Sequence, residues 1–448
     1  MTPPAEPSPP PYSARFARVP AIGAGADLHA EIDGWLGSEP LRELVQAFGG
    51  GPEVLADGAL ADRLDRLDTF SQRWDARQGR ERNLAADLDL TAGQRELAIS
   101  AGEALGLRGP ETLRFDHYDH VLMLGGLIRA CLARPATAAL LLKPGTVPGR
   151  TITAGAITAL GGHRPFAGDE FEQAALEGLA ELTEEYQALD AGTRRAFGLG
   201  EPTSVEHHDS ALPGGTWGIR TYEWRPPSLA AATEAEAEAA GAQDAQHASS
   251  AAASQPDQAA PEQATLEQAA PERASPARAM PQLAALEPAV PERAVPGPGV
   301  PDQAAPDQNA PEQVALRQAV PQRPTPDRAM PKQAASSQAV PIRVVAAPSS
   351  EPELRRANTP DSYAFFAARI ADLAPGSRLL LISTAIHVLP QHLAALRMLG
   401  RPYRAEIDTV SARAGSVPGM PLANFTPTKY LQEIRSTIRI LRQLAADL

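Results

Sequence analysis

The sequence predicts an α/β fold, a Rossmann-like three-layer sandwich with a mostly parallel sheet, plus a helical N-terminal region and a disordered repeat insertion. Three observations carry this prediction. From His120 onward, short apolar runs alternate with amphipathic helical segments, which is typical of a parallel sheet covered on both faces. Before them, apolar residues recur at helical spacings. Between them lie about a hundred residues built almost only from Ala, Pro, Gln, Glu and Arg, which offer little to bury.

Five parts are predicted along the chain: a disordered Pro-rich N-terminus (1–22), a helical region (23–110), the first part of the Rossmann-like domain (111–227), a disordered repeat insertion (228–341) and the second part of that domain (342–448). In the helical region Thr91 is a plausible N-cap. Trp74 lies among charged residues, and we interpret it as a partly buried contact next to the functional site. We expect this region to pack against the sheet domain.

The strands are predicted from runs of apolar or alternating residues. They are His120–Gly126, Thr151–Gly162, Trp217–Trp224, Ile342–Pro348, Arg378–Thr384 and Tyr403–Val410. The intervening helices are predicted at Leu127–Leu142, Glu170–Leu189, Pro360–Leu373, Leu389–Leu399 and Thr428–Leu444. The last of these is amphipathic and is expected to pack on the core.

The insertion keeps a five-residue register from Pro256, as in "PDQAA PEQAT LEQAA". Proline at about every fifth position forbids a continuous helix, so the sequence indicates a solvated tract with polyproline II character. A neutral spacer and a segment that binds a protein partner both remain open. The chain is expected to leave the sheet after Trp224 and to return at Ile342.

Composition excludes several classes of protein. A formal net charge of -13 argues against a nucleic-acid partner. A single cysteine, Cys131, excludes an internal disulfide and is expected to be a buried small residue. The N-terminus lacks the apolar core of a signal peptide and no run of about 18 apolar residues occurs, so we expect a cytoplasmic protein with no membrane partner.

Candidate functional residues directly follow the predicted strands, where ligands bind in open α/β sheets. Gly125 and Gly126 form a strand-to-helix turn, and Arg129 follows one helical turn later. Glu170 follows the second strand and His387 follows the fifth. Each also has a structural interpretation: glycines serve any tight turn, Glu170 can cap its own helix and His387 can be a core histidine. No complete dinucleotide fingerprint is present, and no cofactor is identified.

The order of these motifs resembles the SanA/ElyC/YdcF-like family of bacterial domains of unknown function, roughly from Asp116 to Leu399 without the insertion. The family pattern matches Asp119, Gly125, Gly126, Glu170, Asn358, Thr359, Ser383, Thr384, His387 and Arg397. The resemblance implies that Asn358 points to a ligand while Thr359 caps the following helix. The chain departs from the family by having "LGGHRPFAGDE" where "SGG" is common, and by lacking a membrane anchor.

The sequence therefore favours a protein that binds a small anionic, nucleotide-like ligand at the C-terminal edge of the sheet. Arg129, Asn358 and helix-start amides would bind the anion, and Glu170 and His387 are the catalytic candidates. Whether it is an enzyme stays open. The alternative is a non-catalytic scaffold that uses the helical region and the Pro-rich tract. No metal site is predicted, because neither "DHYDH" (116–120) nor "EHHDS" (206–210), expected to be a loop, has ligand spacing.

Overall fold

The computed structural model describes residues 15–23, 25, 27–76, 87–109, 113–212, 214–227, 339–412 and 425–448. Contacts divide the chain into two units, Met1–Gln243 with Ser336–Leu448, and Asp244–Ala335. The second unit lies outside the described residues, as do the predictions made for the repeat tract between 228 and 338 and for residues 1–14. All described helices and strands belong to the first unit.

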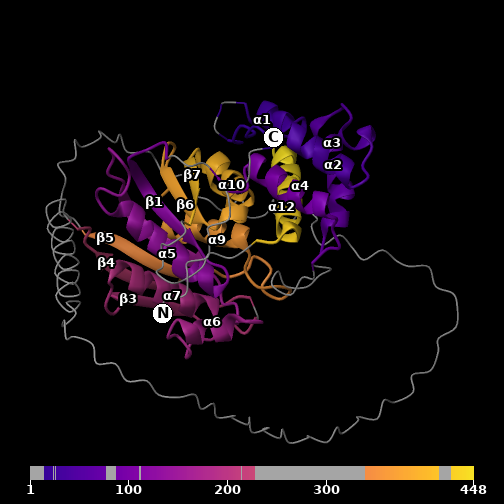
Figure 1. The fold of residues 1–448 in the computed structure, drawn as a ribbon. Helices are drawn as coiled ribbons and strands as arrows, with labels where there is room; N and C mark the ends of the chain where they lie inside the picture. The colour runs from indigo at the N-terminus through magenta and orange to yellow at the C-terminus, as the bar shows by residue number, and fades with distance from the viewer. Residues whose placement is uncertain are drawn as a thin grey trace, which may run out of the picture. The chain divides into compact units, whose positions relative to one another are not determined.

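Within the described residues, seven strands form one sheet in the order β3-β4-β5-β2-β1-β6-β7 (Figure 1). They are β1 (His117–Leu124), β2 (Thr153–Gly161), β3 (Ser204–His208), β4 (Trp217–Trp224), β5 (Val340–Ala346), β6 (Arg378–Ser383) and β7 (Glu406–Ser411). The five strands from β5 to β7 in this order are mutually parallel. β4 pairs antiparallel with β5, and β3 pairs antiparallel with β4. The predicted α/β fold with a mostly parallel sheet is confirmed.

β3 corrects the expectation of a loop at residues 206–210. All five of its residues are exposed, because it is an edge strand with neither face covered. Its sequence, Ser-Val-Glu-His-His, has no alternation of apolar and polar residues. The backbone pairing with β4 therefore defines this strand, and the apolar pattern that reveals buried strands is absent.

The two faces of the central strands are covered by different helices, since successive side chains of a strand point to opposite sides. On one face Val121 and Ile157 share an apolar core with Leu132 of α5 (Ile128–Leu142) and Leu189 of α7 (Glu185–Phe197). The other face is covered by α9 (Thr359–Phe365) and α10 (Val388–Ala395), each ending in a π-helical turn, Phe366–Ile370 and Leu396–Gly400 respectively. The structure thus has the three expected layers.

Several predicted elements differ from the structure in their bounds: β1 begins at His117, three residues before the expected start, and β5 begins at Val340, two residues before it. Two further differences change the elements themselves. The helix expected at 170–189 is two helices, α6 (Glu170–Leu176) and α7, and Gly178 between them has a φ of 72° that favours glycine. The strand expected from Tyr403 begins at Glu406, because Arg401–Tyr403 forms a helical turn, α11, and Arg404 adopts a left-handed φ of 53°.

The N-terminal helices pack on the C-terminal helix. They are α1 (Leu28–Leu36), α2 (Glu39–Ala47), α3 (Leu60–Ser71) and α4 (Ala92–Ala104), with 3-10 turns at Pro52–Leu55 and Gln72–Trp74. Their buried side chains form one core with Leu431, Ile434 and Ile438 of α12 (Pro427–Ala446) and with Leu389 of α10. Thr91 caps α4, as expected. The predicted helix at 428–444 is confirmed as a core helix.

Trp74 belongs to this helical core. Its side chain is completely buried, with ring centroids 5.8 Å from Phe48 and 5.5 Å from Phe70. The interpretation of Trp74 as a partly buried residue next to the functional site is therefore wrong. The charged residues that flank Trp74 in the sequence suggested exposure, although its side chain faces the core.

The long insertion connects two neighbouring strands. Trp224, the last residue of β4, is the register partner of Val340, the first residue of β5. The chain thus leaves and re-enters the sheet at adjacent positions, close to the expected points. None of the helices in the described ranges is long and apolar enough to cross a membrane.

Candidate functional site at the C-terminal edge of the sheet

The loops that follow β1, β2, β5 and β6 start at one edge of the sheet, because these strands are parallel. β2 lies on one side of β1 and β6 on the other. The strand order therefore reverses between β1 and β6, and open α/β sheets bind ligands at such a topological switch point. Every predicted site residue except Arg397 is the last residue of one of these strands or follows it in the loop or the first turn of the next helix.

Gly125 makes a close approach that a side chain would prevent. A Cβ atom on Gly125 would lie 2.9 Å from Cα of Gly161 at the end of β2, and it would also collide with Oε1 of Glu185. The N–H of Gly125 donates a hydrogen bond to the carbonyl of Leu160. The glycine is thus needed to make room for the protein's own carboxylate at the position where we expected a ligand.

Arg164 organises the loop after β2. Its guanidinium donates to both carboxylate oxygens of Glu170, at 2.6 and 2.8 Å, and to Oε2 of Glu185 at 2.9 Å. It also donates to the carbonyl of Gly126 at 2.9 Å. Glu170 in turn accepts from the backbone N–H of Ile128, the first residue of α5, at 3.1 Å. One arginine therefore connects the turn after β1 with the loop after β2 and the start of α7.

Glu170 has no exposed surface. In addition to the contacts above, it accepts a hydrogen bond from the N–H of Ala167 at 3.0 Å. Its carboxylate thus caps α5, satisfying an N–H that has no partner within the helix. Glu170 is the first residue of α6, so the expectation that it caps its own helix is replaced by a cap on a neighbouring one. A carboxylate with this many donors is suited to holding loops together.

Arg134 connects β1 with β6. From the second turn of α5 it donates to the carbonyl of Leu124 at 2.5 Å and to the carbonyl of Gly125. It also donates to Oγ1 of Thr384 through Nε and Nη2, at 3.0 and 2.7 Å. The Arg134 side chain is almost completely buried. Thr384, predicted as a ligand-binding residue, therefore holds this buried guanidinium beside the place where the chain reverses direction.

Glu185 is the carboxylate with the most perturbed environment at this edge. Burial raises its pKa, and the nearby guanidiniums of Arg164, Arg356 and Arg134 act in the opposite direction. Oε2 binds Arg164, whereas Oε1 has no hydrogen-bond partner among the described residues. Carboxyl groups whose pKa is shifted by burial beside a specific charge occur preferentially at functional sites.

Arg129 is a cation at this edge without a partner among the described residues. It lies in the first turn of α5 and is partly exposed. It has no hydrogen bond or ion pair with any residue that the structure describes. A guanidinium held at a helix start without a partner can bind an anion in bidentate geometry.

Asn358 and Thr359 require a correction. Asn358 is the N-cap of α9: its side chain accepts from the N–H of Asp361 at 3.1 Å, and the carboxylate of Asp361 accepts from the N–H of Asn358 at 2.8 Å. Thr359 is the first helical residue, so the expectation that Thr359 caps α9 is wrong, and the cap is the side-chain oxygen of Asn358. The reciprocal pair is a capping box.

His387, Ser383 and Arg397 have partners elsewhere. His387 forms an ion pair with the buried Glu433 of α12, with 3.1 Å between Nδ1 and Oε2. Ser383 is buried and donates to the side chain of Gln391. Arg397, at the far end of α10, donates to Asp447 at 2.8 Å. These contacts do not join the Arg164 cluster.

Sequence reasoning missed Arg134, Arg164, Glu185 and His163. His163 follows Gly162 in the loop after β2, and its Nδ1 lies 3.0 Å from the carboxylate of Glu184. Its Nε2 is buried without a hydrogen-bond partner. Arg134 had a detectable signal, because it is the one charge inside the apolar stretch "ACLARPATAALLL". Cys131 is buried, as expected. Within the described ranges, no three His, Cys, Asp or Glu side chains are grouped so as to hold a metal ion.

Comparisons with known proteins identify relatives of uncharacterised function. A family model described as the Rv3785 N-terminal domain matches residues 20–106, which contain α1 to α4. The chain is 30% identical over 213 residues to the uncharacterized protein Rv3785 of Mycobacterium tuberculosis, covering 42% of this chain and 54% of that protein. The same figures hold for the uncharacterized protein Mb3814 of Mycobacterium bovis.

The chain thus spans about half the length of the curated relatives it matches. No solved structure matches. These findings support a bacterial family of unknown function, and they do not show the SanA/ElyC/YdcF-like family.

Proposed function

We propose that this protein binds a small anionic, nucleotide-like ligand at the C-terminal edge of its parallel sheet. One observation carries the proposal: buried guanidiniums fix the loops after β1, β2 and β6, while Arg129 and Oε1 of Glu185 remain without hydrogen-bond partners among the described residues. The guanidiniums of Arg134 and Arg164 hold the loops at this edge in one conformation. Arg129 and Oε1 of Glu185 are then available to a ligand.

The charge of this edge favours an anion. Positively charged side chains outnumber the negatively charged ones in and around the cluster. The cations are Arg129, Arg134, Arg164 and Arg356, and the anions are Glu170 and Glu185. The local excess is positive, although the whole chain has a net charge of -13. Buried ion pairs add little stability compared with apolar residues of similar size, so a cluster of them at a ligand-binding edge is better explained by function.

The roles of the individual residues follow from their contacts. Arg129 would bind the anionic group directly. Glu185 would contact a polar group of the ligand through Oε1, and its raised pKa makes it the best candidate for proton transfer. We assign Glu170 and Thr384 to positioning, because they are bound to Arg164 and Arg134. His387 would act only after leaving its ion pair with Glu433.

The motif order that resembles the SanA/ElyC/YdcF-like family supports an assignment to the same edge. Gly125, Gly126, Ser383 and Thr384 all lie there. The departure from the family at "LGGHRPFAGDE" coincides with the segment that supplies Arg164 and Glu170. We therefore propose that this chain replaces a backbone cradle for phosphate with a network of side chains.

The test starts with a thermal-shift panel of phosphate, nucleotide and carboxylate compounds on the wild-type protein. Mass spectrometry of small molecules released from the purified protein supplies further compounds. A ligand that shifts the melting temperature is then titrated by calorimetry into wild type, Arg129→Ala and the control Arg195→Ala. Arg195 lies near the end of α7, is exposed, and pairs with Glu177.

Arg129→Ala should weaken binding by about 1.5 to 3 kcal/mol, the usual contribution of a hydrogen bond to a charged group. Arg195→Ala should bind as wild type does. If a ligand is turned over, Glu185→Gln should lower the turnover about a hundredfold or more while binding is kept. If no compound shifts the wild-type melt, or if Arg129→Ala binds an identified ligand unchanged, the scaffold role becomes the better explanation.

A further inference from the structure

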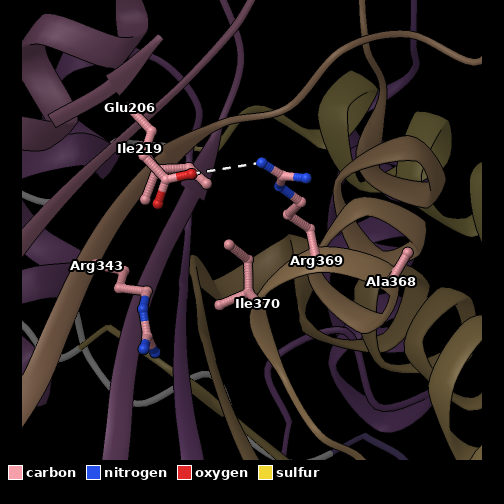
Figure 2. A pocket seen from close by; sticks show the side chains of 6 residues that line it. All are labelled: Glu206, Ile219, Arg343, Ala368, Arg369 and Ile370. Atoms are coloured by element: carbon pink, nitrogen blue, oxygen red, sulfur yellow. Dashed lines mark hydrogen bonds and ion pairs between the residues drawn. The ribbon is translucent and has the colours of Figure 1, made fainter.

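A polar hollow lies on the face of the sheet that α9 covers, away from the C-terminal edge. It has a volume of about 430 Å³ and is lined by Glu206, Ile219, Arg343, Ala368, Arg369 and Ile370 (Figure 2). The lining residues come from β3, β4, β5 and the π-helical turn that ends α9. This volume is in the range of small-molecule sites.

Arg343 is the unusual residue in this hollow. It lies in the middle of β5, between the completely buried Ile342 and Val344. Its side chain is partly buried and has no hydrogen bond or ion pair with any residue that the structure describes. Strands in the interior of a parallel sheet normally have apolar side chains on both faces, and a partly buried unpaired charge is costly. The position therefore calls for an additional negative partner.

Two further polar groups lie on the same face of the neighbouring strands. Thr158 of β2 is the register partner of Arg343 and also of Leu122 in β1. Thr158 is completely buried, and its Oγ1 has no hydrogen-bond partner. His120, two residues before Leu122 and hence on the same face, has a buried Nδ1 without a partner. Neither residue lines the hollow, but buried polar atoms without partners are rare, and these two make the interior beside Arg343 unusually polar.

No described carboxylate forms an ion pair with Arg343, including Glu223 of β4, which lies on the same face two residues from Thr221, the register partner of Arg343. Arg369 and Glu206 form an ion pair of 3.4 Å between exposed side chains. The guanidinium of Arg369 also lies 4.9 Å from the ring centroid of Trp217. Figure 2 shows the Arg369 side chain reaching toward Glu206, whereas that of Arg343 extends away from this pair. Glu206 thus compensates Arg369 and not Arg343.

We propose that this hollow is a second ligand site, which binds an oxyanion, a phosphate or carboxylate group of a small molecule. Arg343 supplies the main charge-assisted contact, because its planar guanidinium matches both groups in bidentate geometry. Arg369 lies at the rim, where its positive charge attracts the same anion. The site is independent of the edge site, since Arg343 lies three residues before the end of β5 and faces α9.

The experiment is a calorimetric titration of the full chain with inorganic phosphate and, separately, with succinate, in a low-salt buffer free of other oxyanions. Wild type is compared with Arg343→Gln, Arg369→Gln, Arg129→Ala and the control Arg195→Gln. Arg343→Gln should weaken one saturable binding event at least tenfold, and Arg369→Gln should weaken the same event several-fold. Arg195→Gln and Arg129→Ala should change it less than twofold.

The two probes and the variants separate the outcomes. If phosphate binds and succinate does not, the ligand of the site is a phosphate ester. If both bind, the site accepts phosphate and carboxylate groups alike. The proposal is overturned if neither probe saturates, if only Arg129→Ala removes the event, or if Arg343→Gln and Arg195→Gln weaken it equally. Circular dichroism checks the fold of each variant. If Arg343→Gln does not fold, Arg343→Lys and Arg369→Gln decide: unchanged binding in both overturns the proposal.

Discussion

Removing the repeat tract is the sharpest test of how this fold is built. Trp224 and Val340 are paired neighbours in β4 and β5, so a short hairpin can replace everything between them. The perturbation deletes residues 228–338 and joins Pro227 to Ala339 through four residues, Gly-Asn-Gly-Ser. The connection then has eight residues, and the strands keep their register.

Loop-closure entropy sets the expected magnitude. Residues 225–339 form a connection of about 115 residues, and the cost of closing a flexible loop grows as 1.5 RT times the logarithm of its length. Shortening it to about 8 residues should raise the free energy of unfolding by up to about 2.4 kcal/mol. A tract poor in branched apolar and aromatic residues buries little area that could oppose this gain.

The assay is urea unfolding of the wild type and the deletion variant, monitored by circular dichroism and by tryptophan fluorescence. We expect unchanged or higher stability and a single transition for the described elements. A control variant in which the tract is replaced by a Gly/Ser segment of equal length separates the effect of length from that of sequence. A loss of more than about 2 kcal/mol in the deletion, shared by the control, would show that the tract packs on the core and would refute the reasoning.

Three further predictions concern the core and its pH dependence. Leu431→Ala should cost about 2 to 5 kcal/mol and should shift the circular dichroism and fluorescence melts together, because Leu431 is buried between α12 and the N-terminal helices; separate melts would contradict this. Burial raises the pKa of Glu185 above the ordinary value of 4.5. Its contribution to the free energy of unfolding should therefore be lost as pH rises through the folded-state pKa. In urea unfolding, Glu185→Gln should flatten this decline of the free energy of unfolding with pH. Burial lowers the pKa of His392 to about 4, so the unfolded chain binds the proton first and stability should fall by about 1.4 kcal/mol from neutral pH to pH 5.5. His392→Gln should lose this slope, and an unchanged slope would show that His392 does not cause it.

Most of the sheet was predictable because burial on both faces leaves a strong signal. β2, β6 and the second half of β1 are almost continuous apolar runs, and a sheet covered on both faces buries such runs. β3 was not predictable on this basis, since its residues are exposed on both faces. The division between α6 and α7 depends on a turn at Gly178, whose positive φ is a property of the folded backbone. Glycine in a helical pattern indicates such a break only weakly.

The sequence predicted the location of the candidate site in the fold better than it predicted the residues that form it. Topology alone brings Gly125, Glu170 and Thr384 to one edge, and the structure places them there. The sequence cannot show which long side chains cross from one loop to another. Arg134 reaches Thr384 across 250 positions in sequence, and no local pattern encodes that contact. The cap at Asn358, by contrast, was readable from Asp361 three residues later.

The Glu185 carboxylate also explains why a glycine occupies the turn after β1. In dinucleotide-binding folds a glycine at this place lets a ligand's phosphate approach the backbone. Here the space beside Gly125 holds the carboxylate of Glu185, which is bound to Arg164. If the edge binds an anion as proposed, its side-chain charges are already positioned by their neighbours, and little reorganisation is needed on binding. A preorganised edge of this kind should be rigid before binding, so hydrogen exchange of the hydrogen-bonded Gly125 and Ile128 amides should be slow without ligand. Replacing Arg164 by Gln should accelerate that exchange, whereas replacing the unpaired Arg129 should leave it unchanged.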